Sequence, residues 1–185
     1  MAPFKLGQVK GDTDAEHFYA PNFEQIITTS GTARIVAGVP AGNSLVFETL
    51  CDVLSPPYYL LYVLHTPRGE GSPGRYQSPE LTHDDLRAFL KRFGPFLAGD
   101  ARFDVWVYSI KDKGTIIWDR HNRIFAYGDL EAFIAKFRMM GFQMGPSPIP
   151  DPHIHHYRQE FDADAAEVLV YFDWMNSPLR PEDEQ

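Results

Sequence analysis

The chain has 185 residues, of which 44% are hydrophobic, 14% aromatic and 23% charged. This length and composition suit one globular domain and exclude wholesale disorder, and the single cysteine excludes a disulfide scaffold. A formal net charge of −8, without any Lys/Arg-rich run, argues against nucleic acid as a partner. The longest uncharged run, residues 53–67, contains three prolines and is too short to cross a membrane. The N-terminus has no signal-peptide core, so we expect a cytoplasmic protein that binds no membrane.

The first third of the chain is predicted to contain a hairpin, a helix and a buried strand. Residues 24–29 and 33–36 are rich in β-branched side chains, and a short glycine-containing loop between them predicts a hairpin. Apolar residues then recur at helical spacing from 45 to 54. Residues 58–65 form a continuous apolar and aromatic run, which is typical of a central strand covered on both faces.

The middle of the chain is predicted to form a helix, a meander and a second helix. Thr82 is expected to cap the first of these helices, and Gly94-Pro95 is expected to end it. Three β-rich stretches joined by short loops predict an antiparallel meander: 103–110, 115–119 and 123–127. Asp129 is expected to begin the next helix, whose apolar stripe runs to Met140.

The last part of the chain is harder to assign. Residues 145–156 contain four prolines, so we expect an extended and irregular segment. An aspartate at 162 or 164 is expected to cap a final helix that reaches Trp174, although the short apolar run there also fits a strand.

These elements predict an α+β fold. We expect a single domain over residues 1–176, followed by an acidic, disordered tail over residues 177–185. The domain would contain a mixed, mostly antiparallel sheet with three or four packed helices. The N-terminal hairpin, the buried central strand and the three-strand meander would all belong to that sheet.

A cluster of histidines is the most specific chemical feature. His153 and His155 would share one face of an extended segment, whereas the adjacent His156 would point away. Two imidazoles with a carboxylate can bind zinc or another divalent metal, and Glu160 is the predicted third ligand. More distant candidates for the remaining ligands are His65, His121 and Asp119. A solvated surface loop is the alternative interpretation.

The loop after the buried strand matches the spacing G-x-G-x-x-G over residues 69–74. This spacing binds a dinucleotide only where a helix begins at the glycines, and here the next helix is expected further along the chain. We therefore predict no organic cofactor. The flanking Arg68 and Arg75 are candidates for contact with an anion or a partner, as are His156 and Tyr157.

Two functions of different classes fit these observations. The first is a non-enzymatic protein-binding module, such as an inhibitor, an immunity-type protein or an accessory factor, because no nucleophile motif is present. Residues 151–185 carry 2 basic and 9 acidic side chains, a net charge of −7, so its partner would present a basic surface. The alternative is a metal-dependent enzyme or metal-binding protein that uses His153 and His155.

Overall fold

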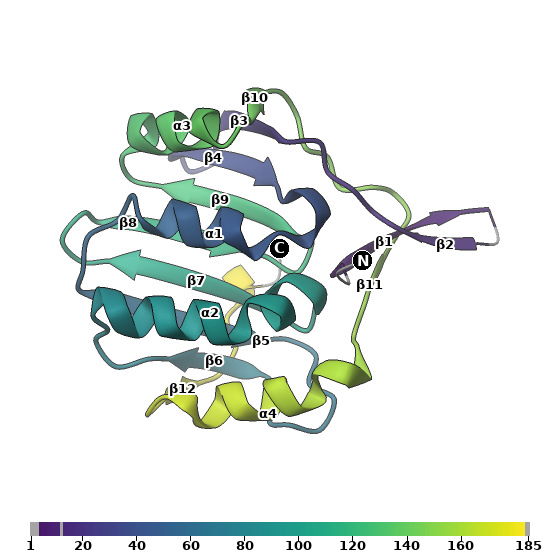
Figure 1. The fold of residues 1–185 in the computed structure, drawn as a ribbon, viewed down its shortest axis with the longest axis vertical. Helices are drawn as coiled ribbons and strands as arrows, with labels where there is room; N and C mark the ends of the chain where they lie inside the picture. Colours follow the sequence, from purple (N-terminus) through teal and green to yellow (C-terminus); the bar gives the residue numbers. More distant parts are fainter. Residues whose placement is uncertain (1–3, 12, 184–185) are drawn as a thin grey trace.

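The structure, a computed structural model that describes residues 4–11 and 13–183, has the α+β fold predicted from the sequence (Figure 1). Its main sheet has nine strands, in the spatial order β10 (Gln143–Met144), β3 (Asn22–Ile27), β4 (Ala33–Gly38), β9 (Arg123–Tyr127), β8 (Gly114–Trp118), β7 (Phe103–Ser109), β5 (Tyr58–Leu64), β6 (Gly74–Gln77) and β12 (Met175–Ser177). A second sheet has the order β11 (His153–His155), β1 (Leu6–Lys10) and β2 (Thr13–Glu16). The pairing of β10 with β3 is parallel and the other strand pairs are antiparallel, so the prediction of a mixed, mostly antiparallel sheet is confirmed.

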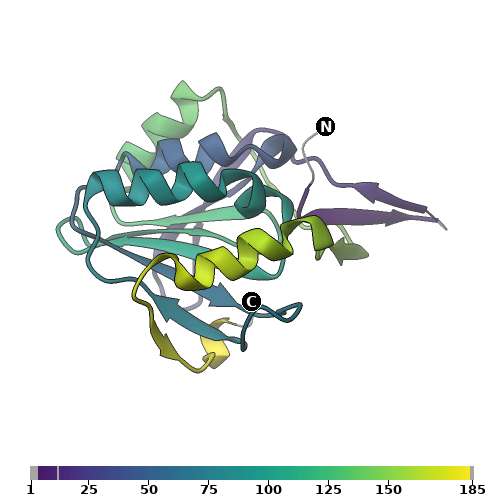
Figure 2. The ribbon, with the colours of Figure 1, turned by 60° about the horizontal axis from the view of Figure 1, so that its bottom comes forward.

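The helices in the described residues are α1 (Ser44–Cys51), α2 (His83–Gly99), α3 (Leu130–Met139) and α4 (Asp162–Tyr171). Helices α1, α2 and α3 lie side by side across one face of the main sheet, and α4 lies beside its β6 end (Figures 1 and 2). Short 3-10 turns complete the elements: η1 (Pro40–Gly42), η2 (Gln159–Phe161) and η3 (Pro181–Asp183). Among the described residues we find no helix with the length and apolar character needed to cross a lipid bilayer.

The main core lies between the helices and the sheet. Phe47, Phe89 and Phe133, one from each covering helix, are fully buried against strand residues such as Leu60 and Val105. Alternation along the strands places a second, smaller apolar cluster on the opposite face: Val36, Ile117 and Phe125. Strands β4, β8 and β9 therefore bury apolar side chains on both faces, whereas β5 is fully buried on the helix-covered face and Tyr59 and Leu61 on its second face are only half-buried, so the expected burial of both of its faces is only partly met.

Helix α2 continues past the point where the sequence predicted its end. Pro95 lies inside the helix, which runs to Gly99, so the expected stop at Gly94-Pro95 is wrong. Proline removes one backbone hydrogen bond, but Phe96 and Leu97 extend the stripe begun by Phe93, and all three are at most 1% exposed. Burial of this additional turn offsets the lost bond.

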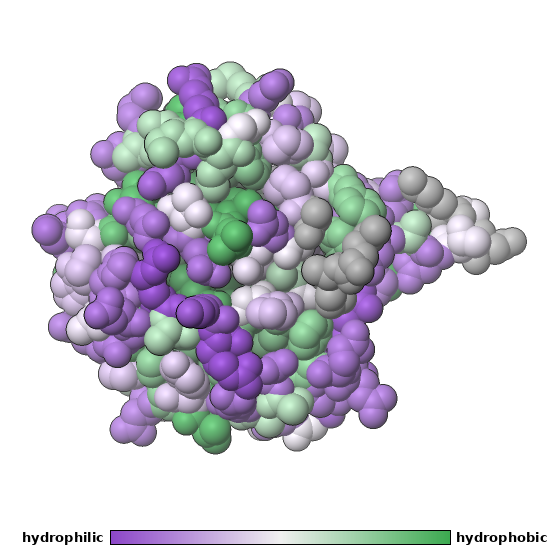
Figure 3. Space-filling view, viewed as in Figure 1, coloured by the Kyte–Doolittle hydropathy of each residue, from purple (hydrophilic) through white to green (hydrophobic). Residues whose placement is uncertain are grey.

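The hairpin of β1 and β2 was not predicted from the sequence. It projects from the body of the protein and carries mainly hydrophilic residues (Figures 1 and 3). Its inner strand pairs with β11, where Leu6 faces His155 and Gln8 faces His153. The proline-rich segment, expected to be irregular, therefore contains a short strand.

The acidic C-terminal end also differs from the expected disordered tail as far as the structure describes it. Strand β12 pairs with β6, and Asp183 is 1% exposed and forms an ion pair with Arg75. The backbone nitrogen of Arg180 donates a second hydrogen bond to Asp183, at 2.8 Å. A buried carboxylate with two partners gives this end a fixed place on the fold, and Glu184 and Gln185 lie outside the described residues.

Candidate metal centre

His153 and His155 lie on the same face of β11, as the alternation of an extended segment predicts. Strand β11 is held by antiparallel pairing with β1, and the next residue, His156, donates its backbone N–H to the carbonyl of Lys5 at 2.8 Å. The His156 side chain points to the other face, where its Nε2 lies 2.7 Å from the position that a Cβ of Gly7 would occupy. The absence of a side chain at Gly7 therefore leaves room for the His156 ring. This ring lies on the opposite face of the segment from His153 and His155.

The third histidine of the centre, His121, comes from the turn between β8 and β9. Asp119 shapes this turn, because its Oδ1 accepts a hydrogen bond from the backbone nitrogen of Arg123 at 2.7 Å. Asn122 has a left-handed backbone (φ 61°), and its side chain accepts from Trp118 Nε1 at 2.9 Å. These bonds hold the His121 backbone in place, and its ring is largely buried.

The three imidazoles form a compact triangle. Their ring centroids are 4.8 Å apart for His121 and His155, 5.2 Å for His153 and His155, and 5.3 Å for His121 and His153. One nitrogen atom from each ring lies within 4.8 Å of the other two nitrogens. Nitrogens bound to one tetrahedral zinc at 2.0–2.1 Å are about 3.3 Å apart, so modest side-chain rotation brings all three to one ion.

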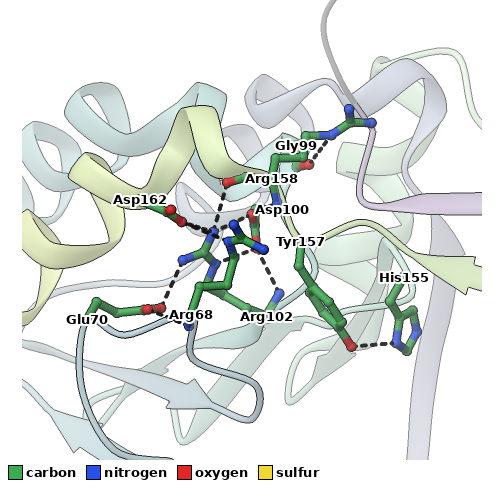
Figure 4. A network of polar contacts seen from close by, with 9 residues as sticks. All are labelled: Arg68, Glu70, Gly99, Asp100, Arg102, His155, Tyr157, Arg158 and Asp162. Atoms are coloured by element: carbon green, nitrogen blue, oxygen red, sulfur yellow. Dashed lines mark hydrogen bonds and ion pairs between the residues drawn. The ribbon is translucent and has the colours of Figure 1, made fainter.

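Each ring also has an outer partner on its Nδ1 atom. His121 Nδ1 lies 3.2 Å from Asp119 Oδ2, and His153 Nδ1 lies 3.1 Å from the carbonyl of Pro150. His155 Nδ1 lies 3.4 Å from the hydroxyl of Tyr157 (Figure 4). Contacts of this kind fix the orientation of metal-binding histidines and leave Nε2 as the ligand atom.

The environment of His155 keeps its imidazole neutral near pH 7. Burial is the main cause that lowers its pKa to about 4, and the positive charges that His121 and His153 would carry when protonated add to the effect. His155 is therefore neutral near pH 7, with a lone pair on one ring nitrogen. Its Nε2 is buried and has no hydrogen-bond partner among the described residues, so this atom is available to a ligand.

A network of charged side chains anchors the segment that follows β11. Arg102 is fully buried and forms ion pairs with Asp100, Glu70 and Asp162 (Figure 4). Asp100 also accepts the backbone N–H of Arg158 at 2.8 Å. Because Arg158 directly follows Tyr157, this network helps to hold Tyr157 beside His155.

The structure does not bring the other predicted site residues into the triangle. Glu160 lies exposed on η2, outside the group of three histidines. The predicted anion-contact residues Arg68 and Arg75 instead form ion pairs with Asp162 and Asp183. The distant candidates behave differently from one another: His121 joins the centre and Asp119 supports it, whereas His65 pairs with Asp104 at 3.0 Å.

Comparisons of the chain with protein-family models, characterised proteins and solved structures gave no match. The functional interpretation therefore depends on the geometry and chemistry of the histidine triangle. Only the sequence Asp119-x-His121 in a predicted hairpin turn indicated the third candidate ligand, and nothing local in the sequence relates that turn to residues 153–155.

Proposed function

We propose that this protein binds a divalent transition-metal ion through His121, His153 and His155. The observation that supports this most directly is the convergence of three ring nitrogens within 4.8 Å, with a separate hydrogen-bond partner on the Nδ1 atom of each ring. Imidazole ligands suit zinc, cobalt, nickel and copper better than magnesium or calcium, which prefer oxygen. Zinc is the first candidate because three histidines are one of its established ligand sets.

The number of protein ligands favours a catalytic centre over a structural one. Structural zinc sites use four protein ligands, whereas catalytic sites use three and leave one position for water or substrate. His153 is exposed, so solvent can reach the open side of the triangle. An ion held by three neutral imidazoles keeps its full charge and lowers the pKa of a bound water to about 7. We therefore propose metal-dependent hydrolysis as the reaction class.

The residues around the triangle support this chemistry in defined ways. Asp119 orients the His121 ring and increases the basicity of its free nitrogen, as a carboxylate does in a carboxylate–histidine–metal arrangement. The hydroxyl of Tyr157 performs the corresponding positioning role for His155. The low pKa of His155 lets it bind metal without first losing a proton near pH 7.

The test is calorimetric titration of the metal-free protein with zinc chloride at pH 7.5. We expect one ion per chain, bound with micromolar affinity or better, and no binding by His121→Ala or by the double variant His153→Ala/His155→Ala. His156→Ala is the matched control, because it removes an adjacent histidine on the opposite face and should bind normally. Glu160→Gln should also bind normally. Zinc binding that survives the loss of the triangle would refute the proposed site.

The hydrolytic part of the proposal needs its own measurement. The zinc-loaded protein should hydrolyse simple activated esters, such as 4-nitrophenyl acetate or bis(4-nitrophenyl) phosphate, and His121→Ala should not. Stoichiometric zinc binding without hydrolysis of either ester would leave a metal-binding protein and remove the proposed enzymatic function.

A further inference from the structure

Lys5 is a fully buried lysine immediately before β1. Its Nζ atom lies 4.3 Å from the ring centroid of Trp118 and 5.0 Å from that of Phe103. Burial lowers its pKa to about 8, while the carboxylates of Asp119, Asp104 and Asp100 act in the opposite direction. A methionine of similar length would fill this space without the cost of removing an ammonium group from water, so packing alone does not explain a lysine here.

Lys5 contacts both segments that supply the histidine triangle. Its backbone carbonyl accepts the N–H of His156 at 2.8 Å, directly after the strand that carries His153 and His155. Its Nζ atom donates to the backbone carbonyl of Asp119 at 3.2 Å, in the turn that carries His121. One residue thus spans the gap between a strand of the small sheet and a turn of the main sheet.

We propose that Lys5 is a positioning residue of the metal centre, which sets the separation between His121 and the pair His153/His155. This inference rests on the proposed metal-binding function. The ammonium group holds the Asp119 carbonyl, and the Asp119 carboxylate in turn orients the His121 ring. Metal ligands must be held within about 0.5 Å of their productive positions, so a small shift of this turn weakens binding.

The test compares zinc affinity in the wild type, in Lys5→Met and in a control that is destabilised elsewhere. Lys5→Met keeps the backbone hydrogen bond to His156 and removes only the ammonium group. Phe137→Leu is the control, because Phe137 is fully buried on α3 and its ring packs against Phe23 and Phe142. We expect Lys5→Met to bind zinc at least tenfold more weakly, within the range known for outer-shell substitutions, and Phe137→Leu to bind like the wild type. The visible spectrum of the cobalt-substituted protein, which reports coordination geometry, should change in Lys5→Met alone.

The experiment separates a failure of the positioning role of Lys5 from a failure of the metal site. Equal zinc affinity in Lys5→Met and the wild type, or equal weakening in Lys5→Met and Phe137→Leu, would overturn the positioning role while the metal site itself stands. If the wild type binds no zinc, the proposed function fails first, and the role of Lys5 fails with it. If Lys5→Met does not fold, Lys5→Leu, which also lacks the donor group, is measured against the same criteria, and unchanged affinity again overturns the proposal.

Discussion

At the scale of single residues, the roles of neighbouring histidines are decided by the face on which each lies. His155 and His156 are adjacent in the chain, yet one points into the triangle and the other lies against Gly7 on the opposite face. The period of two along a strand is sufficient to produce this difference. A shift of one residue in the pairing of β11 with β1 would exchange the two histidines and remove the centre.

The buried ammonium group of Lys5 should also affect how stability depends on pH. Its pKa is about 8 in the folded chain against an ordinary value of 10.5, so between these values the unfolded chain binds more protons than the folded chain. The contribution of Lys5 to the free energy of unfolding therefore rises from about pH 8 towards pH 10.5. In urea unfolding with a chelator present, the free energy of unfolding of the wild type should rise relative to that of Lys5→Met between pH 7.5 and pH 10. Titrating tyrosines affect both proteins alike, so a difference that stays constant would contradict the burial of a titrating Lys5.

Among the elements, helix α3 allows the stabilisation from core packing to be compared with the stabilisation from the N-terminal cap. Phe133 is fully buried, and Phe133→Ala should lower the free energy of unfolding by about 3–5 kcal/mol through lost burial and a new cavity. Asp129 caps the same helix by accepting the N–H of Ala132 at 3.1 Å, and Asp129→Ala should cost only about 1 kcal/mol. Similar denaturation midpoints for the two variants would contradict the packing described for α3.

Elements with strong local patterns could be predicted from the sequence. The hairpin of β3 and β4, the strand β5, the meander of β7, β8 and β9, and the Thr82 and Asp129 helix caps all occur where the residue pattern places them. Strands β1, β11 and β12 are short and depend on distant partners, so no local period identifies them. The continuation of α2 through Pro95 likewise depends on what Phe96 and Leu97 pack against.

The candidate site, like the fold, could be predicted from the sequence only where a local pattern determines the structure. Alternation in an extended segment placed His153 and His155 on one face, and the structure agrees. His121 was a distant candidate because its approach to them depends on how a three-stranded sheet docks on a nine-stranded one. Glu160 was selected by proximity along the chain, whereas η2 places it outside the group of three histidines.

At the scale of the whole molecule, the acidic C-terminal end is partly built into the fold. Asp183 is buried and pairs with Arg75, which lies over the Trp106 ring at 5.6 Å. Asp183→Asn should lower the free energy of unfolding by about 2–3 kcal/mol, because it leaves the Arg75 guanidinium without its carboxylate. Asp173→Asn, at an exposed acidic position in the same region, is the control and should change stability by less than about 0.5 kcal/mol. Equal effects in thermal or urea unfolding would show that the Asp183 contact does not stabilise the fold.

The expectation that the acidic end attracts a protein with a basic surface stays a prediction. Four of its acidic residues form ion pairs within the chain, so any such attraction depends mainly on the other acidic side chains of residues 151–185: Asp162, Asp164, Glu167 and Asp183 are the paired ones.

We propose that one metal ion is bound by two histidines of β11 and one histidine of the β8–β9 turn. Anomalous diffraction at the zinc edge, from crystals grown with one equivalent of zinc, tests it most directly. We predict a single strong anomalous peak at bonding distance, about 2.0–2.1 Å, from one nitrogen each of His121, His153 and His155. An absence of any peak at the triangle, or a peak bound by other residues with the three rings unchanged, would contradict the claim.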